Sequence, residues 1–428
     1  MTISRSAPPE KPTISVVVLN YNGLHHLEDC FVSLMHLEYP VDKLELILVD
    51  NGSKADPTPF IERRFPRVKV LVNSRNLGFA EGSNVGARAA AGRYVAFLNN
   101  DTRVHPEWLT HLVTSVSRSP DVVCAGSRIL NWEGDRVDFI GGELAFYGHG
   151  FQEAFGSPET DSCRKEREVL FACGGAMLIE RQVFLDAGGF DPDYFAFFED
   201  IDLGWRLWVL GHRVVLQPAS VVYHKHHGTA GKLPAEWKYV MYERNALYTI
   251  IKNYDQANLD KVLPAALLLS AKRGLSLGRV DKRKYYLDSE ILGGAAADRG
   301  SMGTETAGPS PLARLGNSLR EVGFVETCRR FVLLVAAFTE RLPHYGVDHI
   351  TKPGMSHFIA MDDVLVNMQK TLEKRTAIQA ARRRDDAEIF RLFKGPFRSN
   401  CAGAGYDEAL SDVSRLFGID EMFGAADE

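Results

Sequence analysis

Long apolar runs are missing from this sequence of 428 residues. The two longest, residues 262–269 and 331–338, fall well short of the roughly 20 apolar residues that a membrane-spanning helix needs. Basic residues lie beside both runs, a composition typical of helices that rest on an anionic membrane surface. Because packed core helices have the same composition, the sequence leaves contact with a membrane surface and contact with protein open.

Cysteine pairs and a massed positive charge are missing as well. The six cysteines form no Cys-x-x-Cys pair and no zinc-like spacing, which favours a reducing, cytoplasmic setting. The net charge is −5 and the basic residues are spread, so nothing indicates a nucleic-acid partner. Residues 1–12 are polar and lack an apolar signal region, so we expect a flexible tail and not an export signal. The sequence therefore predicts a cytoplasmic protein, with peripheral contact at the inner face of the cell membrane left open.

The composition that is present, 45% hydrophobic and 25% charged, is ordinary for a globular protein of two or three domains. Apolar runs that read as strands alternate with helical patterns from residue 14 to about 126, which predicts an α/β fold with a parallel sheet covered on both faces. The expected strands are residues 14–19, 44–49, 68–72, 94–98 and 122–125. The expected helices are residues 24–36, a short helix from Pro57, one from about Glu81 to Gly92, and one from Pro106.

The rest of the chain is less regular. Residues 126–224 predict loops and short strands, and the chain beyond Trp237 predicts helices. We expect an α/β domain over residues 13–254, a helical extension over 255–292 with a candidate membrane-surface contact, a linker over 293–311, and a helical region over 312–428.

Polar clusters follow four of the expected strands. Asn20-Tyr21-Asn22-Gly23, Asp50-Asn51-Gly52-Ser53, Asn76-Leu77-Gly78-Phe79 and Asn99-Asn100-Asp101 each stand where a strand ends. Since the carboxyl ends of parallel strands meet at one edge of a sheet, these clusters are expected to build a single ligand pocket.

Asp50, Asp101 and the lack of a glycine-rich fingerprint indicate which ligand this pocket would bind. Asp50 suits a nucleobase N–H or a ribose hydroxyl, although an N-cap or a turn would also use it. Asp101 is a candidate ligand of Mg²⁺ or Mn²⁺ with a nucleoside diphosphate completing the shell, and a polar turn after a strand is the alternative. The Gly-x-Gly-x-x-Gly fingerprint is missing after the first strand, which argues against a dehydrogenase and favours a metal at the diphosphate.

A second polar segment, Glu199-Asp200-Ile201-Asp202, follows an aromatic run and opens a predicted helix. The helix dipole and free backbone N–H groups stabilise an ionised carboxylate in the first turn, which suits a general base for a hydroxyl nucleophile. The alternative is an ordinary acidic helix start.

A third segment, residues 221–224, is a β-branched strand that ends in His224. Neutral imidazole is a good ligand for Mn²⁺, so His224 could complete the shell begun by Asp101, although lone histidines are usually structural. The basic, glycine-containing residues 225–232 could fold over a diphosphate or form a solvated loop.

The order of these motifs, together with Gly174-Gly175-Ala176, resembles the family 2 glycosyltransferases of GT-A fold, and among them the rhamnosyltransferase-type enzymes of bacterial surface polysaccharide assembly. The resemblance covers residues 14–254 and implies a Rossmann-like, mostly parallel central sheet flanked by helices. It implies Asp200 as the catalytic base, with Glu199 beside it, and a metal held by Asp101 and His224. The implied nucleotide-sugar residues are Asn20, Tyr21, Asp50, Asn51, Gly52, Asn76, Gly78, Phe79, Asn84, Asn100 and Asp101, and the implied acceptor-side residues are Gly174, Gly175 and Asp202.

The implied activity is an inverting transfer of a sugar from a nucleotide-diphosphate donor to a hydroxyl of a glycan or lipid-linked acceptor, with Mg or Mn as cofactor. Rhamnose on a deoxythymidine carrier is the first expectation. The Gln-x-x-Arg-Trp motif of processive synthases is absent, which favours addition of one or a few sugars. A sugar nucleotidyltransferase would need a glycine- and basic-rich loop after the first strand, and a non-catalytic sugar-nucleotide-binding protein would not need Glu199, Asp200 and Asp202.

Overall fold

The computed structural model describes residues 11–225, 234–280, 350–401 and 405–424. The predicted linker, the apolar run 331–338, most of the predicted tail and residues 226–232 of the predicted loop lie outside these ranges. The domain boundaries proposed from the sequence therefore stay predictions.

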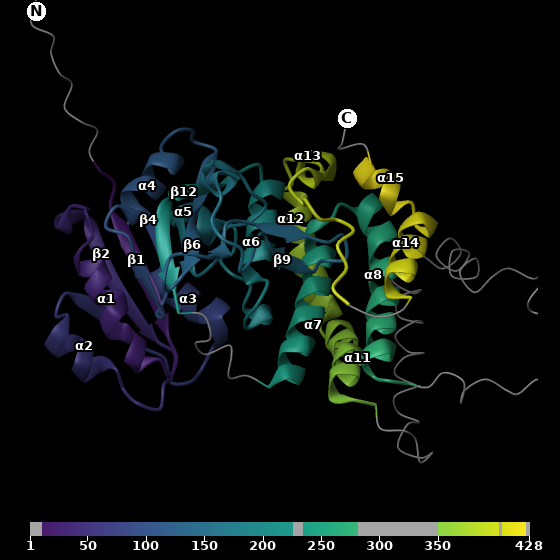
Figure 1. Cartoon of the computed structure of the whole chain (residues 1–428), viewed down its shortest axis with the longest axis horizontal. Helices are drawn as coiled ribbons and strands as arrows, with labels where there is room; N and C mark the ends of the chain where they lie inside the picture. Colours follow the sequence, from purple (N-terminus) through teal and green to yellow (C-terminus); the bar gives the residue numbers. More distant parts are fainter. Residues whose placement is uncertain (1–10, 226–233, 281–349, 402–404, 425–428) are drawn as a thin grey trace, which may run out of the picture.

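A ten-stranded sheet forms the centre of the N-terminal half of the molecule (Figure 1). β1 pairs in parallel with β2 and β4, β2 with β3, and β6 with β12, whereas β11 runs antiparallel between β4 and β6. Along the sheet the strands are β10 (Arg167–Glu168), β12 (Arg213–His224), β6 (Val122–Asn131), β11 (Ala176–Glu180), β4 (Tyr94–Asn99), β1 (Ile14–Asn20), β2 (Leu44–Asp50) and β3 (Val68–Val72), with β5 (Thr102–Val104) on β12 and β7 (Val137–Phe139) on β6.

The central strands are apolar along their length because helices cover both of their faces. Every residue of β1 except Leu19 is buried. The covering helices include α1 (Leu27–Met35), α2 (Thr58–Arg64), α3 (Gly78–Ala89) and α4 (Trp108–Val116). This arrangement confirms the predicted α/β class: the pairs among β1, β2, β3 and β4 are parallel as expected, and β11 makes the sheet a mixed one.

Two predicted boundaries were wrong for reasons of close packing. α3 begins at Gly78 and not at Glu81. A Cβ atom on Gly78 would lie 2.4 Å from Phe195 O, so this glycine lets the start of the helix approach another segment closely. The strand expected to stop at Ala125 continues through Gly126 to Asn131. A Cβ atom on Gly126 would lie 2.8 Å from the Cβ atom of Ala172, so this glycine permits close packing inside a strand and does not end it.

The segment expected to hold loops and short strands also contains regular elements. β12 is a strand of 12 residues, and β11 inserts into the middle of the sheet. The shorter elements are β8 (Gly142–Leu144) and β9 (Gly150–Gln152), which pair with each other, α5 (Arg181–Asp186), the 3-10 turn η4 (Pro192–Tyr194) and α6 (Glu199–Val209).

The remainder of the described chain is helical, as predicted, and packs beside α6 (Figure 1). Its helices are α7 (Ala235–Asn253), α8 (Gln256–Leu277), α11 (Lys352–Val366), α12 (Met368–Ala380), α13 (Asp386–Phe390), α14 (Tyr406–Leu416) and α15 (Ile419–Gly424).

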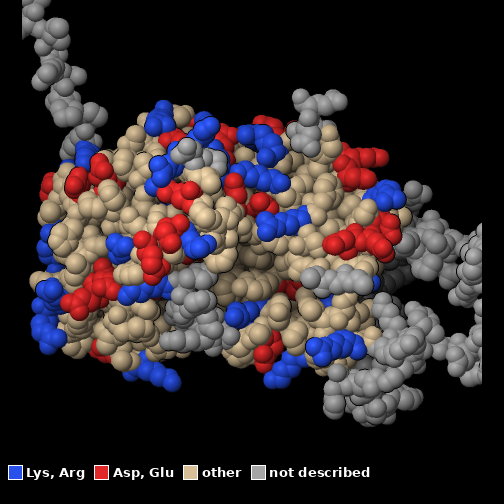
Figure 2. All heavy atoms as spheres, in the orientation of Figure 1, with Lys and Arg blue, Asp and Glu red and all other residues tan. Residues whose placement is uncertain are grey.

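The apolar run 262–269 lies in α8 and is covered by protein. Val262 and Leu269 are buried, and the nearby Arg273 pairs with Glu243 of α7 at 2.7 Å. Of the two contacts that the sequence left open for this run, the structure shows contact with protein, since its apolar side chains fill the space between helices. Among the described residues, no helix combines the length and apolarity needed to cross a bilayer. Charges of both signs intermix on the face drawn in Figure 2.

Candidate active site

The polar clusters that follow β1, β2 and β4 meet at one edge of the sheet. Asn20 lies opposite Asp50 in the β1–β2 pair, and Leu19 lies opposite Asn99 in the β1–β4 pair. The Nδ2 atom of Asn20 donates to Asp50 Oδ1 at 2.8 Å, and Asn100 Nδ2 donates to Asn20 Oδ1 at 2.7 Å. Residues from three strand ends thus form one hydrogen-bonded row.

Asp50 also closes a turn with Ser53. The carboxylate accepts from Ser53 N at 3.0 Å and from Ser53 Oγ at 2.6 Å. The next turn residue, Gly52, has a φ of 75°, and a Cβ atom there would lie 2.6 Å from the backbone of Arg75. Tyr21 is half-buried in the turn after β1. Asp50 therefore combines the turn role left open by the sequence with a place at the sheet edge.

Asn51 and Asn84 are buried and hold neighbouring segments. Asn51 Nδ2 donates to Asn76 Oδ1 and to Gly78 O, both at 2.9 Å, which fixes the loop that leads into α3. Asn84 Nδ2 donates to Phe190 O at 2.7 Å, and Asn84 Oδ1 accepts from Phe190 N at 3.0 Å. The two side chains therefore fix the start of α3 and tie that helix to the segment around Phe190.

His224 lies between two carboxylates. Its Nε2 atom is 3.2 Å from Asp101 Oδ1, and its Nδ1 atom is 2.5 Å from Asp138 Oδ2. Burial alone would lower the pKa of His224, but the hydrogen bonds and charges of Asp101 and Asp138 outweigh burial and raise this pKa to about 10. Burial likewise opposes ionisation of Asp101, yet the hydrogen bond and charge of His224 lower the pKa of that carboxyl.

Asp138 is a site residue that the sequence analysis missed. It is 5% exposed and belongs to the short apolar strand β7. An aspartate between two buried apolar residues, Val137 and Phe139, was the available signal.

Because its pKa is raised to about 10, His224 carries a proton on both ring nitrogens at neutral pH when no metal is bound. A divalent cation that also binds diphosphate oxygens would displace the proton on Nε2, and the donor set then suits it. The separation of 3.2 Å between His224 Nε2 and Asp101 Oδ1 is close to the roughly 3 Å between neighbouring ligands of an octahedral cation. A carboxylate on the far nitrogen of a metal-binding histidine is a common second partner, and Asp138 supplies it. Within the described part of the chain, no three His, Cys, Asp or Glu side chains gather around a single metal position, so a diphosphate would have to complete the shell.

The carboxylates of Glu199 and Asp200 lie at the start of α6. Asp200 Oδ2 accepts from Gly174 N at 3.0 Å, and Asp200 Oδ1 accepts from Ile201 N at 2.9 Å. Burial raises the pKa of Asp200, and these backbone N–H groups oppose the rise.

Glu199 behaves differently from its neighbour. Burial, followed by the charge of Asp200, raises the pKa of Glu199 well above its ordinary value. Its Oε2 atom is buried and has no hydrogen-bond partner among the described residues, as suits a neutral acid. Of the two carboxyl groups, Glu199 therefore holds a proton more readily and Asp200 is the better base.

Gly174 and Gly175 join the two halves of the site. Gly175 O accepts from Asn99 N at 2.9 Å, at the end of β4. A Cβ atom on Gly175 would lie 2.7 Å from Asn99 Nδ2, and one on Gly174 would lie 3.1 Å from the ring of Phe79. The absence of side chains here lets the tip of β4 lie against this glycine pair, and Gly174 N contacts Asp200 at the start of α6. Through these contacts one continuous edge runs from the end of β4, which precedes Asp101, to Asp200.

Asp202 does not lie on an acceptor side. It is 0% exposed, and its carboxylate contacts Arg206 Nη2 at 2.6 Å, Lys252 Nζ at 2.9 Å and Asn253 Nδ2 at 3.0 Å. Lys252 also contacts Asp191, which in turn pairs with Lys374 of α12. The expectation for Asp202 is corrected: in the first turn of a helix its side chain faces inward, into an ion cluster that ties α6 to α7 and α12.

Of the predicted loop 225–232, the structure describes Lys225. Its Nζ atom pairs with Asp29 of α1 at 2.5 Å and lies 4.3 Å from the centre of the Trp132 ring.

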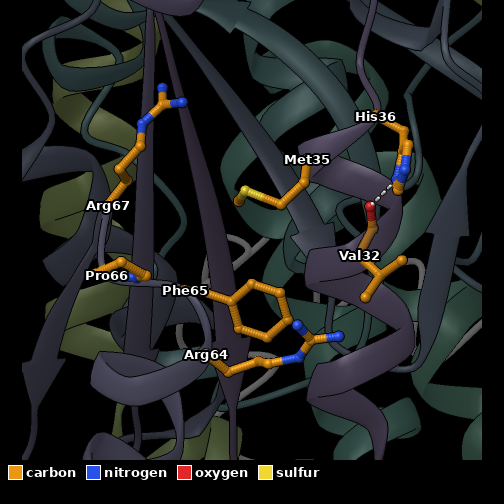
Figure 3. A pocket seen from close by; sticks show the side chains of 7 residues that line it. All are labelled: Val32, Met35, His36, Arg64, Phe65, Pro66 and Arg67. Carbon is orange, nitrogen blue, oxygen red and sulfur yellow. Dashed lines mark hydrogen bonds between the residues drawn. The ribbon is translucent and has the colours of Figure 1, made fainter.

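A cavity of about 250 Å³ lies away from this edge, between α1 and the segment after α2 (Figure 3). α1 runs back from the carboxyl edge, so its last turn reaches the opposite end of the sheet. The lining residues are Val32, Met35, His36, Arg64, Phe65, Pro66 and Arg67. The cavity shares no residue with the candidate site.

Comparison with known proteins identifies the family. The family model described as Glycosyl transferase family 2 matches residues 15–187. An N-acetylglucosaminyl-diphospho-decaprenol L-rhamnosyltransferase of Mycobacterium tuberculosis (strain CDC 1551 / Oshkosh) is 31% identical over 246 residues, which cover 52% of this chain and 79% of that protein. The O-antigen biosynthesis protein RfbC of Myxococcus xanthus is 30% identical over 225 residues, which cover 50% of this chain and 17% of that protein.

Among solved structures, the crystal structure of GalNAc-T7 with UDP, GalNAc and Mn2+ is similar with a TM-score of 0.49 and 21% identity, over 60% of this chain and 52% of that chain. The family match includes the polar ends of β1, β2 and β4 as well as Gly174 and Gly175. With 31% identity to a relative of which it covers 79%, the chain belongs to the family 2 glycosyltransferases.

Proposed function

We propose that this glycosyltransferase moves a sugar, L-rhamnose as the first candidate, from a nucleoside-diphosphate donor to a hydroxyl of a lipid-linked or glycan acceptor. The transfer inverts the anomeric carbon and serves bacterial cell-surface polysaccharide synthesis. The observation that carries the proposal is the continuous edge between the Asp101–His224 pair and Asp200, joined through Gly174, Gly175 and Asn99.

Each part of this edge has a role in the proposal. The row of Asn20, Asp50 and Asn100 receives the nucleoside, with Asn51 and Asn84 as supports. Asp101 and His224 would hold Mg²⁺ or Mn²⁺, and that cation would stabilise negative charge on the departing diphosphate. Asp138 holds the His224 ring so that Nε2 faces Asp101.

Asp200 is the proposed general base. Two backbone N–H groups fix its carboxylate, and the free lone pairs can accept the proton of an acceptor hydroxyl. The acceptor oxygen forms a bond to the anomeric carbon while the bond from that carbon to the diphosphate oxygen breaks. The diphosphate leaves with the electron pair, and the proton stays on Asp200. Glu199 keeps its own proton, so the negative charge of the two carboxyl groups sits on Asp200.

The rhamnose donor and a polyprenyl-diphosphate acceptor are inferred from the mycobacterial relative, whose name states an L-rhamnosyl transfer to N-acetylglucosaminyl-diphospho-decaprenol. A panel of dTDP-rhamnose, UDP-N-acetylglucosamine, UDP-galactose and GDP-mannose, each with and without Mn²⁺, tests the proposal. We expect release of nucleoside diphosphate from dTDP-rhamnose in the presence of the metal. Release from another donor would reject rhamnose, and no release from any donor with metal and a GlcNAc-diphospho-lipid acceptor would contradict the proposed function.

Replacement of Asp138 by asparagine tests the metal half of the site. An amide side chain could not carry the negative charge that now holds His224 Nδ1, so the ring would lose its fixed orientation. We expect Mn²⁺ affinity in the presence of nucleoside diphosphate to fall roughly 10- to 100-fold. Titration with Mn²⁺ followed by electron paramagnetic resonance measures this change. Asp135→Asn, an exposed change in the turn before β7, is the matched control, and equal Mn²⁺ affinity in both variants would exclude Asp138 from the site.

A further inference from the structure

A buried amide on α7 holds the backbone that leads into α6. Asn245 is 0% exposed, and its Nδ2 atom lies within hydrogen-bond distance of three backbone carbonyl oxygens: Tyr194 O at 3.1 Å, Ala196 O at 2.9 Å and Phe197 O at 2.7 Å. The other amide atom, Oδ1, accepts from Arg244 Nε at 3.1 Å. The side chain is therefore oriented by partners on both of its ends.

The backbone that Asn245 holds is strained. Phe195, Phe197 and Phe198 have φ angles of 61°, 70° and 67°, in the left-handed region that non-glycine residues rarely adopt. Phe195 also has a ψ of −62°, and Ala196 N donates to Tyr194 O at 2.7 Å. This combination is a γ-turn of the rare, strained kind. Such conformations are unfavourable by themselves and persist only where surrounding contacts enforce them.

The contacts that enforce this turn come from two helices. Asn245 of α7 binds the carbonyl groups of Tyr194, Ala196 and Phe197, and Ala80 N in the first turn of α3 donates to Phe195 O at 3.2 Å. Loss of the Asn245 amide would leave the three carbonyl oxygens close together and would remove the donor that they share. Such a loss favours relaxation of the left-handed residues toward ordinary conformations.

The strained turn ends two residues before Asp200. Phe198 is the N-cap of α6, and Asp202 N donates to Phe198 O at 3.0 Å to begin the helix. A change in the turn therefore moves the first turn of α6, where the Asp200 carboxylate accepts from Gly174 N.

We propose that Asn245 is a positioning residue of this glycosyltransferase, whose amide holds the turn 194–198 in the shape that sets the place of the Asp200 carboxylate. The inference rests on the proposed role of Asp200 as base. Asn245 lies outside the family match of residues 15–187, on a helix that supplies no group to the sheet edge.

The test is Asn245→Leu, which keeps the approximate size of the side chain and removes its donors. We expect turnover of the active nucleotide sugar to fall about tenfold or more, because small displacements of a catalytic group have large effects on rate. Affinity for the nucleoside diphosphate, measured by calorimetry, should stay within about twofold, since the Asn245 side chain bonds to the turn 194–198 and to neither Asn20 nor Asp50. Unchanged turnover in the folded variant, or an equal loss of affinity and turnover, would overturn the proposal.

A double variant separates positioning from general destabilisation. If Asn245 acts through Asp200, Asn245→Leu should lower turnover in the wild-type background and have almost no further effect in the Asp200→Asn background. If the double variant instead loses turnover by the product of the two single-variant factors, the proposal is overturned. If Asp200→Asn alone keeps full turnover, the proposed base is wrong, and that result is distinct from a failure of the inference about Asn245.

Thr249→Val is the matched control. Thr249 is also buried on α7 and bonds to the Tyr194 hydroxyl at 2.8 Å, but it donates to none of the carbonyls of the turn. Its turnover should stay within about twofold of wild type. If Asn245→Leu does not fold, Asn245→Ser, which keeps one donor, is tested in its place. Reduced turnover of this variant with normal nucleotide affinity supports the proposal. Wild-type turnover in Asn245→Ser, or failure of both variants to fold, rejects it.

Discussion

Asp200→Asn lowers turnover by about a hundredfold or more and leaves nucleoside-diphosphate affinity nearly unchanged, as expected for loss of a general base. Asparagine keeps the size of the side chain and can still accept from Gly174 N, so the local backbone stays in place. What is lost is the ability to take the proton of the acceptor hydroxyl. Steady-state turnover and calorimetric nucleotide affinity, measured on the same preparation, check the result.

The control is Asp186→Asn, an exposed aspartate at the end of α5, which should keep full turnover. An equal loss of affinity and rate in Asp200→Asn would mean that Asp200 holds the structure together and does no chemistry. The pH dependence gives a second check. Because burial raises the pKa of Asp200 and the base must be ionised, turnover should fall as the pH drops through this raised pKa.

Asp101→Ala abolishes the response of nucleotide binding to Mg²⁺ or Mn²⁺. Asp101 supplies the carboxylate oxygen that faces His224 Nε2 at 3.2 Å, and alanine supplies no ligand in its place. With a single protein ligand left, a diphosphate and its cation have no fixed position on the sheet edge. Nucleoside-diphosphate affinity measured by calorimetry with and without Mn²⁺ should differ in the wild type and be equal in the variant.

Asp260→Ala, which removes an exposed carboxylate from α8, should keep the full metal response. A metal response in Asp101→Ala equal to that of the wild type would exclude Asp101 from the cation site. A reduced response in both variants would indicate a general effect of net charge and would count against the assigned position.

The sequence predicted the sheet edge well because the signals there are local. A run of apolar residues such as 14–19 reads as a buried strand, and the polar residues after it must then stand at the strand end. Register across β1, β2 and β4 follows from parallel pairing, so the meeting of Asn20, Asp50 and Asn99 was predictable without knowing any long-range contact.

The parts that were missed depend on contacts between distant residues. Asp138 meets His224 across 86 positions, and Asn245 meets Phe197 across 48. Periodicity does not report which buried polar groups pair. The composition of the run 262–269 left contact with a membrane and contact with protein open. The structure shows contact with protein, where the nearby Arg273 faces Glu243 of α7.

The ion cluster around Lys252 ties α6 and the turn before it to the helices that follow. Asp202 and Asp191 precede α7, whereas Lys252 and Lys374 belong to α7 and α12. A shortened protein that stopped at β12 would keep Arg206 beside Asp202 but would remove both lysine partners of Asp191. Any shortened version for crystallisation or assay should therefore retain α7 and α12.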